Sequence, residues 1–266
     1  MSTVDPLLLA AARVSTFLGP HALTNASGFF FQRDDRLFLV TSRHVVIDEA
    51  AKHFPDRLEI ELHTDARNLT QSTGFSLLLY QRGAAVWRQG RDAGGEIDVA
   101  VIELDRSKLP PSAVIEALTP EHLLPDFDHV PVGESLLVVG FPLGFHDALH
   151  HLPVVRHAVL ASAYGIRFQG QGFFLTDART HRGTSGAPVV MRDASPTAKT
   201  AALPWRLLGV HSARMDMGDR DLVLDESLGL NCAWYADILL TLTERTQGGT
   251  IGATAPAARP AGSPKP

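Results

Sequence analysis

The sequence predicts an all-β protein made of two six-stranded antiparallel β-barrels and a C-terminal α-helix. Short apolar runs bounded by turn residues recur along the chain in two series of about six each. Apolar residues recur at helical spacing in only one long stretch, near the end of the chain. Strands that are not separated by helical crossovers pair with antiparallel neighbours, so the two series favour two barrels over an α/β sheet.

The first barrel is predicted over residues 1–110. Asp5 and Pro6 are the residue types preferred at the N-cap and at the first position of a short helix. The apolar runs on either side of residues 32–36 predict a hairpin with a polar tip, and the alternation at residues 58–62 predicts a strand with one buried face. Further strands are expected at residues 75–80, 85–88 and 99–104.

A linker is predicted at residues 111–131, because this part of the chain is rich in proline and acidic side chains. One helical turn is expected within it, at residues 113–118. Residues 247–266 consist largely of Gly, Ala, Pro and Ser and bury too little apolar area to offset the entropy of ordering, so a disordered tail is predicted there. The second barrel is predicted over residues 132–246, with strands at residues 136–139, 154–161, 173–175, 188–191 and 207–210 and a helix at residues 233–242.

Composition excludes several classes of protein. The chain has 24 Lys and Arg against 29 Asp and Glu, and without a basic run nucleic acid is excluded as the main partner. Its apolar runs fall far short of the roughly 20 residues that cross a bilayer, which excludes an integral membrane protein and a membrane partner. Cys232, the single cysteine, is expected to be an inert buried thiol at the helix start. No basic residue precedes the apolar stretch at residues 7–12, so a reducing, cytoplasmic location is expected.

Four histidines form the strongest candidate for a metal site: His146, His150, His151 and His157. His146 and His150 are four residues apart, but no carboxylate pattern such as H-E-x-x-H accompanies them, and Pro153 follows closely. A solvated histidine-rich loop explains the cluster better. The sequence therefore predicts neither a metal nor an organic cofactor.

Three short segments carry residues suited to nucleophilic catalysis. His44 directly follows a predicted strand, Asp98 enters an apolar strand, and Ser185 stands between two glycines in a loop that leads into a strand. Each segment alone fits a structural role. A serine hydroxyl is a poor nucleophile until a base takes its proton, and an imidazole, with an ordinary pKa of about 6.5, suits that task near neutral pH. The order of histidine, acid and serine therefore indicates an activated serine.

The same segments resemble the motifs of the trypsin/chymotrypsin-like serine peptidases. The nearest likeness is to bacterial members without disulfides, which include glutamate-specific endopeptidases. The resemblance implies two β-barrels with the active cleft between them. The matching stretches are Thr41-Ser42-Arg43-His44, Asp98-Val99-Ala100-Val101 and Gly183-Thr184-Ser185-Gly186-Ala187-Pro188.

The resemblance also implies a role for each residue. Ser185 is the nucleophile, His44 the general base, and Asp98 the carboxylate that holds His44 in the required tautomer. The backbone N–H groups of Gly183 and Ser185 form the oxyanion hole. Ser212 matches the serine that borders the buried aspartate and the substrate strand.

Three basic residues match positions around the pocket for the substrate residue before the scissile bond. Arg179 matches the base of that pocket, six positions before the nucleophile, and Arg214 belongs to the strand that forms its far wall. His211 matches a histidine that contacts the substrate carboxylate in the glutamate-specific relatives. Charge-assisted hydrogen bonds to a carboxylate are about twice as strong as neutral ones, so a pocket lined by these residues would prefer Glu or Asp. The alternative interpretation, in which Arg179 and Arg214 point to solvent, stays open.

The predicted function is a serine endopeptidase that hydrolyses protein or peptide substrates. An α/β-hydrolase fits poorly, because its G-x-S-x-G elbow needs glycine where Ala187 stands and its strand and helix pattern is absent. A second interpretation stays open, in which a catalytically silent trypsin-like fold acts as a protein-binding module. A covalent fluorophosphonate label on Ser185 separates the two.

Overall fold

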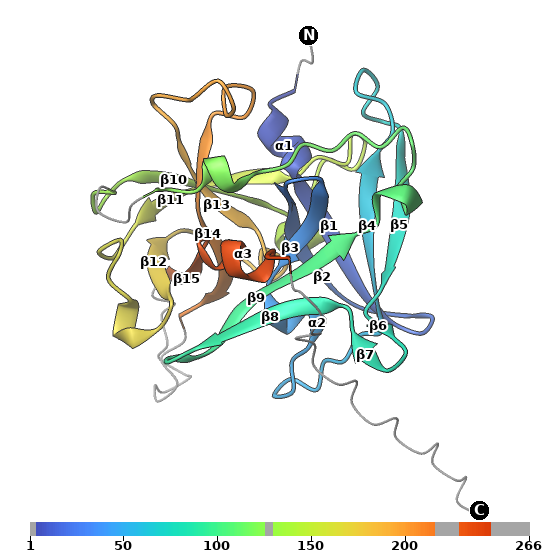
Figure 1. Ribbon diagram of the computed structural model, residues 1–266, viewed down its shortest axis with the longest axis horizontal. Coiled ribbons are helices and arrows are strands. Elements are labelled where there is room, and N and C mark those ends of the chain that lie inside the picture. The colour runs from blue at the N-terminus through green and yellow to red at the C-terminus, as the bar shows by residue number, and fades with distance from the viewer. Residues whose placement is uncertain (1–3, 126–129, 216–228, 246–266) are drawn as a thin grey trace, which may run out of the picture.

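The computed structural model describes residues 4–125, 130–215 and 229–245, which form two β-sheet units (Figure 1). In the first unit seven strands are hydrogen-bonded in the order β5-β4-β1-β2-β3-β9-β8, and all neighbours are antiparallel. Its strands are β1 (Ala11–Leu18), β2 (His21–Arg33), β3 (Arg36–Thr41), β4 (Arg57–His63), β5 (Ser72–Leu78), β8 (Trp87–Asp92) and β9 (Gly95–Leu104), with a small hairpin of β6 (Tyr80–Gln81) and β7 (Ala84–Ala85) beside them.

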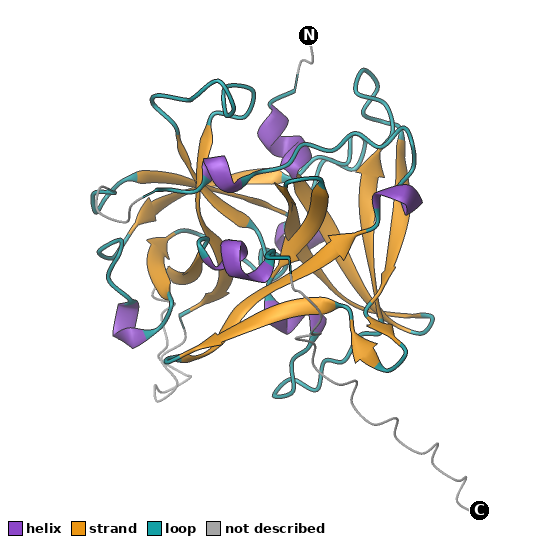
Figure 2. Ribbon diagram, in the orientation of Figure 1, coloured by secondary structure: helices purple, strands orange, loops and turns teal. Residues whose placement is uncertain are grey.

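The second unit is a closed barrel in the order β10-β11-β12-β15-β14-β13. Short helical turns connect the strands of both units, and strands dominate the chain (Figure 2). The barrel strands are β10 (Ser135–Gly140), β11 (Val154–Leu160), β12 (Phe173–Asp177), β13 (Pro188–Arg192), β14 (Trp205–Arg214) and β15 (Leu230–Tyr235). The helices are α1 (Pro6–Ala10), α2 (Arg43–Val46) and α3 (Ile238–Leu242), with 3₁₀ turns η1 (Arg106–Lys108), η2 (Pro120–His122), η3 (Pro142–Gly144) and η4 (Phe168–Gly170).

The all-β class with two antiparallel units and a small C-terminal helix is confirmed. The first unit holds seven paired strands rather than six, because the chain before the first predicted hairpin is itself a strand, β1. The residue boundaries assigned to the barrels and the linker stay a prediction. The tail predicted over residues 247–266 lies outside the described residues.

Two local predictions at the ends of the chain need correction. Asp5 caps α1 through a hydrogen bond from Leu7 N, but the helix ends at Ala10 and β1 starts at once with alternating buried residues. The C-terminal helix begins at Ile238, five residues later than the helical spacing predicts. Residues 233–235 belong to β15 instead, where the Trp234 ring packs against its partner Phe173 on the neighbouring strand β12, with ring centroids 5.5 Å apart. Cys232 accordingly lies in a strand.

The linker prediction needs a third correction. No helical turn forms at residues 113–118, where the chain is extended along the first unit. Val114 N donates to His63 O at 2.8 Å and Leu118 N donates to Phe30 O at 3.0 Å. These hydrogen bonds satisfy backbone groups that a helical turn would have satisfied within the segment.

One apolar core spans both units and holds the seam between them together. It joins Phe29, Phe31 and Val101 of the first unit to Leu207 and Trp234 of the second. Each unit also has a separate apolar cluster of its own. Close packing of this kind fixes the relative position of the two units, so groups contributed from both sides of the seam can hold a defined geometry.

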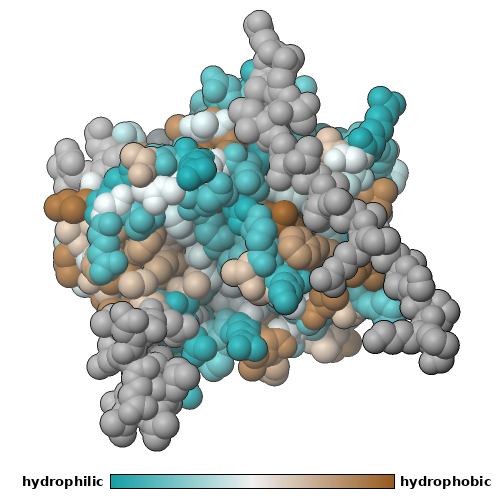
Figure 3. All heavy atoms as spheres, turned by 90° about the horizontal axis from the view of Figure 1, so that it is seen from below, coloured by the Kyte–Doolittle hydropathy of each residue, from teal (hydrophilic) through white to brown (hydrophobic). Residues whose placement is uncertain are grey.

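Polar and apolar side chains share the surface of the molecule. On the face shown in Figure 3, hydrophilic residues run between two areas of more hydrophobic ones. Of the helices in the described ranges, none is long and apolar enough to cross a membrane.

Candidate active site

His44 and Asp98 are brought together by two paired strands. β3 and β9 are antiparallel, with Thr41 opposite Ala100, so the residues just beyond these positions lie side by side. His44 sits in the single turn of α2, directly after β3. Its Nδ1 lies 2.7 Å from Asp98 Oδ2, and its backbone N donates to Asp98 Oδ1 at 2.8 Å. Two hydrogen bonds to one carboxylate therefore fix both the ring and the backbone of His44.

This carboxylate controls the protonation of His44. Burial lowers the pKa of His44 and is the largest single influence on it. The hydrogen bond to Asp98 and its negative charge raise the pKa, as does the charge of Asp48, and Arg43 lowers it slightly. The raising effects prevail, so the pKa of His44 lies above its ordinary value. With Nδ1–H directed at the carboxylate, the neutral ring carries its lone pair on Nε2.

Ser185 stands in the loop between β12 and β13, which two glycines shape. Gly183 and Gly186 have φ angles of +89° and +87°, a region that side chains rarely tolerate. A Cβ at Gly186 would lie 2.2 Å from Ser27 O. The loop therefore needs glycine both for its turn and for its close approach to β2, as the sequence pattern indicates.

Ser212 connects the acid to the serine. Its Oγ donates to Asp98 Oδ2 at 2.5 Å, and its carbonyl accepts a hydrogen bond from Ser185 Oγ at 2.9 Å. The three groups predicted from distant motifs thus meet at the seam of the two units. Within the described part of the chain no hydrogen bond joins Ser185 Oγ to His44, since the hydroxyl is turned to Ser212 instead.

Two backbone N–H groups beside Ser185 are open for a ligand. Among the hydrogen bonds of the described residues, none has Gly183 N or Ser185 N as its donor. The carbonyls of the same two peptide groups are held, Arg182 O by Leu143 N at 2.5 Å and Thr184 O by Ala187 N at 2.9 Å. In a planar trans peptide the N–H points opposite to the carbonyl, so these bonds fix the directions of both open N–H groups.

The three basic residues predicted around the substrate pocket differ in their surroundings. His211 is only 2% exposed, and burial together with the charge of His44 lowers the pKa of His211 to about 4, so it is neutral. Its carbonyl accepts from Gly186 N at 2.7 Å. Arg179 and Arg214 are exposed and form no ion pair with another described residue. The stretch that follows Arg214, residues 216–228, lies outside the described ranges.

Sequence reasoning missed Ser27, a residue of β2 that contacts the loop carrying Ser185. It is fully buried, its N donates to Ser185 O at 2.9 Å, and its Oγ donates to Gly183 O at 2.7 Å. The available signal is weak. Gly28 follows it within a strand, and a glycine in a strand often marks a close approach of backbones.

The histidine-rich segment lies at the surface and makes contacts both within its own loop and with β4, where His151 Nδ1 lies 3.3 Å from Glu61 Oε1 and the His150 carbonyl lies 2.7 Å from His63 Nε2. His150 Nδ1 pairs with Asp147 Oδ2 at 2.7 Å, and His146 Nδ1 lies 2.6 Å from Gly144 O. Across the ranges that the structure describes, no group of three acidic, histidine or cysteine residues could hold a metal ion. Cys232 is partly buried, and burial raises the pKa of its thiol to about 11, which keeps the thiol protonated.

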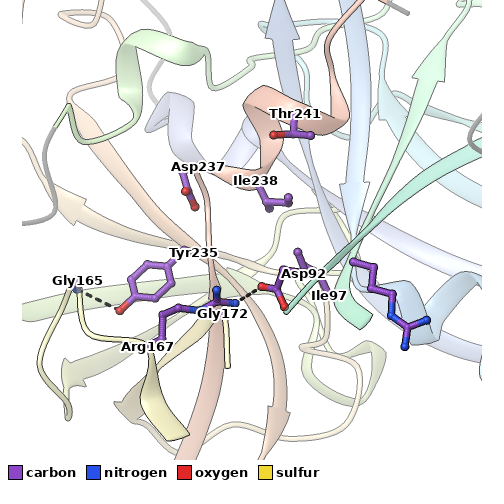
Figure 4. A pocket seen from close by; sticks show the side chains of 10 residues that line it. Asp92, Ile97, Gly165, Arg167, Gly172, Tyr235, Asp237, Ile238 and Thr241 are labelled. Carbon is purple, nitrogen blue, oxygen red and sulfur yellow. Dashed lines mark hydrogen bonds and ion pairs between the residues drawn. The ribbon is translucent and has the colours of Figure 1, made fainter. Parts of the chain in front are cut away.

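A separate cavity of about 480 Å³ lies on the seam, lined by the β8–β9 hairpin, residues on either side of η4, and α3 (Figure 4). Two of its lining residues, Arg167 and Asp92, form an ion pair, and the Tyr235 hydroxyl accepts a hydrogen bond from Gly165 N. None of the predicted catalytic, oxyanion or substrate-binding residues lines it.

Comparison with known proteins places these observations in a family context. A family model described as a trypsin-like peptidase domain matches residues 26–195. The active form of the Rv3671c protease from M. tuberculosis is similar in structure, with a TM-score of 0.50 at 14% identity over 95% of this chain and 90% of that one. A scabies mite inactivated protease paralogue has a TM-score of 0.52 at 18% identity over 90% of this chain and 95% of that one. No curated protein matches the sequence.

Proposed function

This chain belongs to the trypsin-like peptidase domain family, and from that membership we propose that it is a serine endopeptidase in which His44, Asp98 and Ser185 act as a triad. The family supports serine-type peptidase activity in general. The observation that carries the specific proposal is the chain of contacts at Asp98 Oδ2. This oxygen accepts hydrogen bonds from His44 Nδ1 and Ser212 Oγ. The carbonyl of Ser212 in turn accepts a hydrogen bond from the Ser185 hydroxyl.

The first half of the proposed reaction forms an acyl-enzyme. Ser185 Oγ turns about its Cα–Cβ bond from Ser212 O toward His44 Nε2, which takes its proton as Oγ attacks the scissile carbonyl carbon. The C–O bond that forms leaves negative charge on the carbonyl oxygen, and the open N–H groups of Gly183 and Ser185 accommodate that oxygen. Asp98 stabilises the imidazolium of His44 throughout.

The second half of the reaction restores the enzyme. When the tetrahedral intermediate collapses, the C–N bond breaks and His44 Nε2–H gives its proton to the leaving amine. Water then repeats the sequence, with His44 as its base, and hydrolyses the ester on Ser185. Water is the co-reactant of this half: its oxygen forms the new bond to the acyl carbon, the bond to Ser185 Oγ breaks, and the proton that His44 Nε2 took from the water returns to Ser185 Oγ.

We propose in addition that the substrate residue before the scissile bond is acidic. Two exposed arginines, Arg179 and Arg214, which form no ion pair with another described residue, support this preference. Neutral His211 adds no charge, but its buried Nδ1 has no hydrogen-bond partner in the described structure. Cleavage of a peptide library provides the test, and dominance of Lys, Arg or large apolar residues before the cut overturns it. Changing Arg179 to Gln lowers the preference for Glu over Gln by about tenfold, the value of one charge-assisted hydrogen bond.

A binding module is the second candidate function. The Ser185 hydroxyl is engaged with Ser212 O rather than His44, and a similar fold occurs in a scabies mite protease paralogue that is inactivated. Hydrolysis of denatured casein decides between the two functions. The wild type releases peptides and Ser185→Ala does not, if the proposed enzyme is right. A wild type that binds casein without cutting it establishes the binding module.

A further inference from the structure

We propose that Ser27 is a positioning residue that holds the nucleophile loop in its reactive shape from across the seam between the two units. This inference rests on the proposed peptidase function and assigns a role to a residue outside the triad. Ser27 belongs to β2 of the first unit, whereas the loop that carries Ser185 belongs to the second. The nucleophile loop here means residues 183–186.

Ser27 uses every polar atom that it has. Its N donates to Ser185 O at 2.9 Å, and its Oγ donates to Gly183 O at 2.7 Å. The same Oγ accepts from Phe141 N at 2.9 Å, and the carbonyl of Ser27 accepts from Thr41 Oγ1 at 2.8 Å. The hydroxyl is fully buried, so water does not compete with it for these partners. Ser27 is therefore held firmly and in turn holds two points of the loop.

These two points enclose the peptide group that carries one oxyanion donor. Ser185 N–H belongs to the peptide between Thr184 and Ser185. The preceding peptide group contains the Gly183 carbonyl, and the following peptide group contains the Ser185 carbonyl. Ser27 donates a hydrogen bond to each of these two carbonyls. A peptide group can rotate only if its neighbours compensate, and here both neighbours are fixed. Ser27 thus limits the rotation of the peptide whose N–H faces the developing charge.

Gly183 makes this restraint necessary. With a φ of +89° and no side chain, it has access to conformations in which its peptide groups point elsewhere. Leu143 N holds the peptide before Gly183 and the Ser27 hydroxyl holds the peptide after it. Loss of the Ser27 hydroxyl removes the support of the peptide after Gly183 and leaves the support from Leu143 N in place.

Two glycines leave the space that Ser27 occupies. A Cβ at Gly140 in β10 would lie 2.5 Å from Ser27 Oγ, and a Cβ at Gly186 would lie 2.2 Å from Ser27 O. Neither position tolerates even a methyl group without moving Ser27. Gly140→Ala consequently displaces the hydroxyl without removing it, which provides a second route to the same defect.

Thr16 offers a matched control on the neighbouring strand. It is as fully buried as Ser27, and its Oγ1 accepts from Thr24 N at 3.0 Å, with no contact to the nucleophile loop. Thr16→Val and Ser27→Ala each remove one buried hydroxyl that contacts two backbone groups. Ser27→Ala takes the hydroxyl from Gly183 O and Phe141 N, and Thr16→Val takes it from Thr24 N and Thr24 O. Both changes lower stability by comparable amounts, but only the second alters the support of the loop.

The test compares kcat, KM and inhibition by a peptide aldehyde, whose bound oxygen needs the same N–H groups as the transition state. Ser27→Ala and Gly140→Ala lower kcat about 10²-fold, the cost of a misplacement of about 1 Å, and raise the aldehyde Ki in parallel, with KM within twofold. Thr16→Val leaves kcat and Ki within twofold of wild type. If Ser27→Ala does not fold, Ser27→Cys, which keeps a weak donor, replaces it and is expected to fall between Ala and wild type.

The inference is overturned if folded Ser27→Ala, or Ser27→Cys in its place, has a kcat and an aldehyde Ki within twofold of wild type. So does an equal loss in Thr16→Val, since that outcome assigns the effect to stability alone. A wild type without turnover overturns the proposed function, and this inference with it. Turnover by the wild type separates the failure of Ser27 from the failure of the triad.

Discussion

Two regions of this molecule hold a histidine and an aspartate in the same hydrogen bond. At the seam, His44 Nδ1 lies 2.7 Å from Asp98 Oδ2, and in the surface loop after η3, His150 Nδ1 lies 2.7 Å from Asp147 Oδ2. The first pair joins residues 54 apart in sequence, and the second joins residues three apart. The distance is identical, so it is the surroundings that distinguish a catalytic candidate from a local turn.

The surroundings differ in what else the carboxylate binds. Asp98 also accepts from Ser212 Oγ, which connects it to the Ser185 loop. Asp147 accepts instead from the backbone N–H groups of residues 149 and 150. The hydrogen bond with the His150 side chain, followed by these backbone bonds, holds the pKa of Asp147 below its ordinary value. A His–Asp pair therefore indicates catalysis only where distant segments converge on it.

The largest expected effect comes from removing each histidine in turn. His44→Ala lowers kcat by about 10⁶-fold, because triad members act as a unit and lose nearly all catalysis together. His150→Ala, the matched change in the surface pair, leaves kcat within twofold. Steady-state hydrolysis of one peptide substrate measures both, and equal losses in the two variants contradict the distinction drawn between the regions.

Exchanging the acids for amides has the next largest effect. Asp98→Asn keeps the shape but presents an N–H or a neutral oxygen to His44, which disturbs the tautomer and lowers kcat by about 10⁴-fold. Asp147→Asn leaves kcat unchanged, since among the described residues this loop carboxylate forms hydrogen bonds only within its own loop. An Asp98→Asn enzyme with wild-type kcat would show that Asp98 only supports the fold.

Acidification sharpens the comparison through the pKa of His44. In the proposed mechanism the unprotonated form of His44 is the base, so kcat/KM is expected to fall about tenfold per pH unit below the pKa of His44. Because Asp98 raises that pKa, the midpoint lies above the ordinary value of about 6.5. In Asp98→Asn the influence of burial, which lowers the pKa, dominates and the midpoint moves down. NMR titration of the His44 ring in Ser185→Ala measures the midpoint directly, and a value below 6.5 in that protein contradicts the account.

The smallest effect concerns stability. The exposed His150–Asp147 pair lies in solvent, where screening and side-chain entropy offset most of its attraction. His150→Ala is therefore expected to leave the melting temperature unchanged within error, at low and at high salt. A marked, salt-dependent fall measured by calorimetry would mean that the surface pair has a structural role after all.

The sequence allowed prediction of the fold class and of the residues that meet at Asp98, because each lies in a motif with distinctive chemistry. It failed where the local pattern was ambiguous. The apolar residues 233–235 fit a helix and a strand equally well, and only the packing of Trp234 on Phe173 decides for the strand. The short apolar run after Asp5 likewise concealed the point where α1 becomes β1.

Other features depend on contacts that no local pattern encodes. Ser27 is an ordinary strand residue until the second unit packs against it and supplies Gly183 O and Ser185 O. The neutrality of His211 follows from its complete burial next to His44, which the sequence alone does not show. Tertiary packing, and not residue type, decides both roles.

Covalent labelling tests the central claim most directly. A fluorophosphonate reacts with a serine only when a base activates it, so intact-mass analysis after labelling reports the nucleophile and its base together. We expect a single adduct in the wild type, mapped to Ser185 by peptide mass spectrometry, no adduct in Ser185→Ala or His44→Ala, and a wild-type labelling rate in His150→Ala. An unlabelled wild type, an adduct on another residue, or undiminished labelling of His44→Ala would contradict the account.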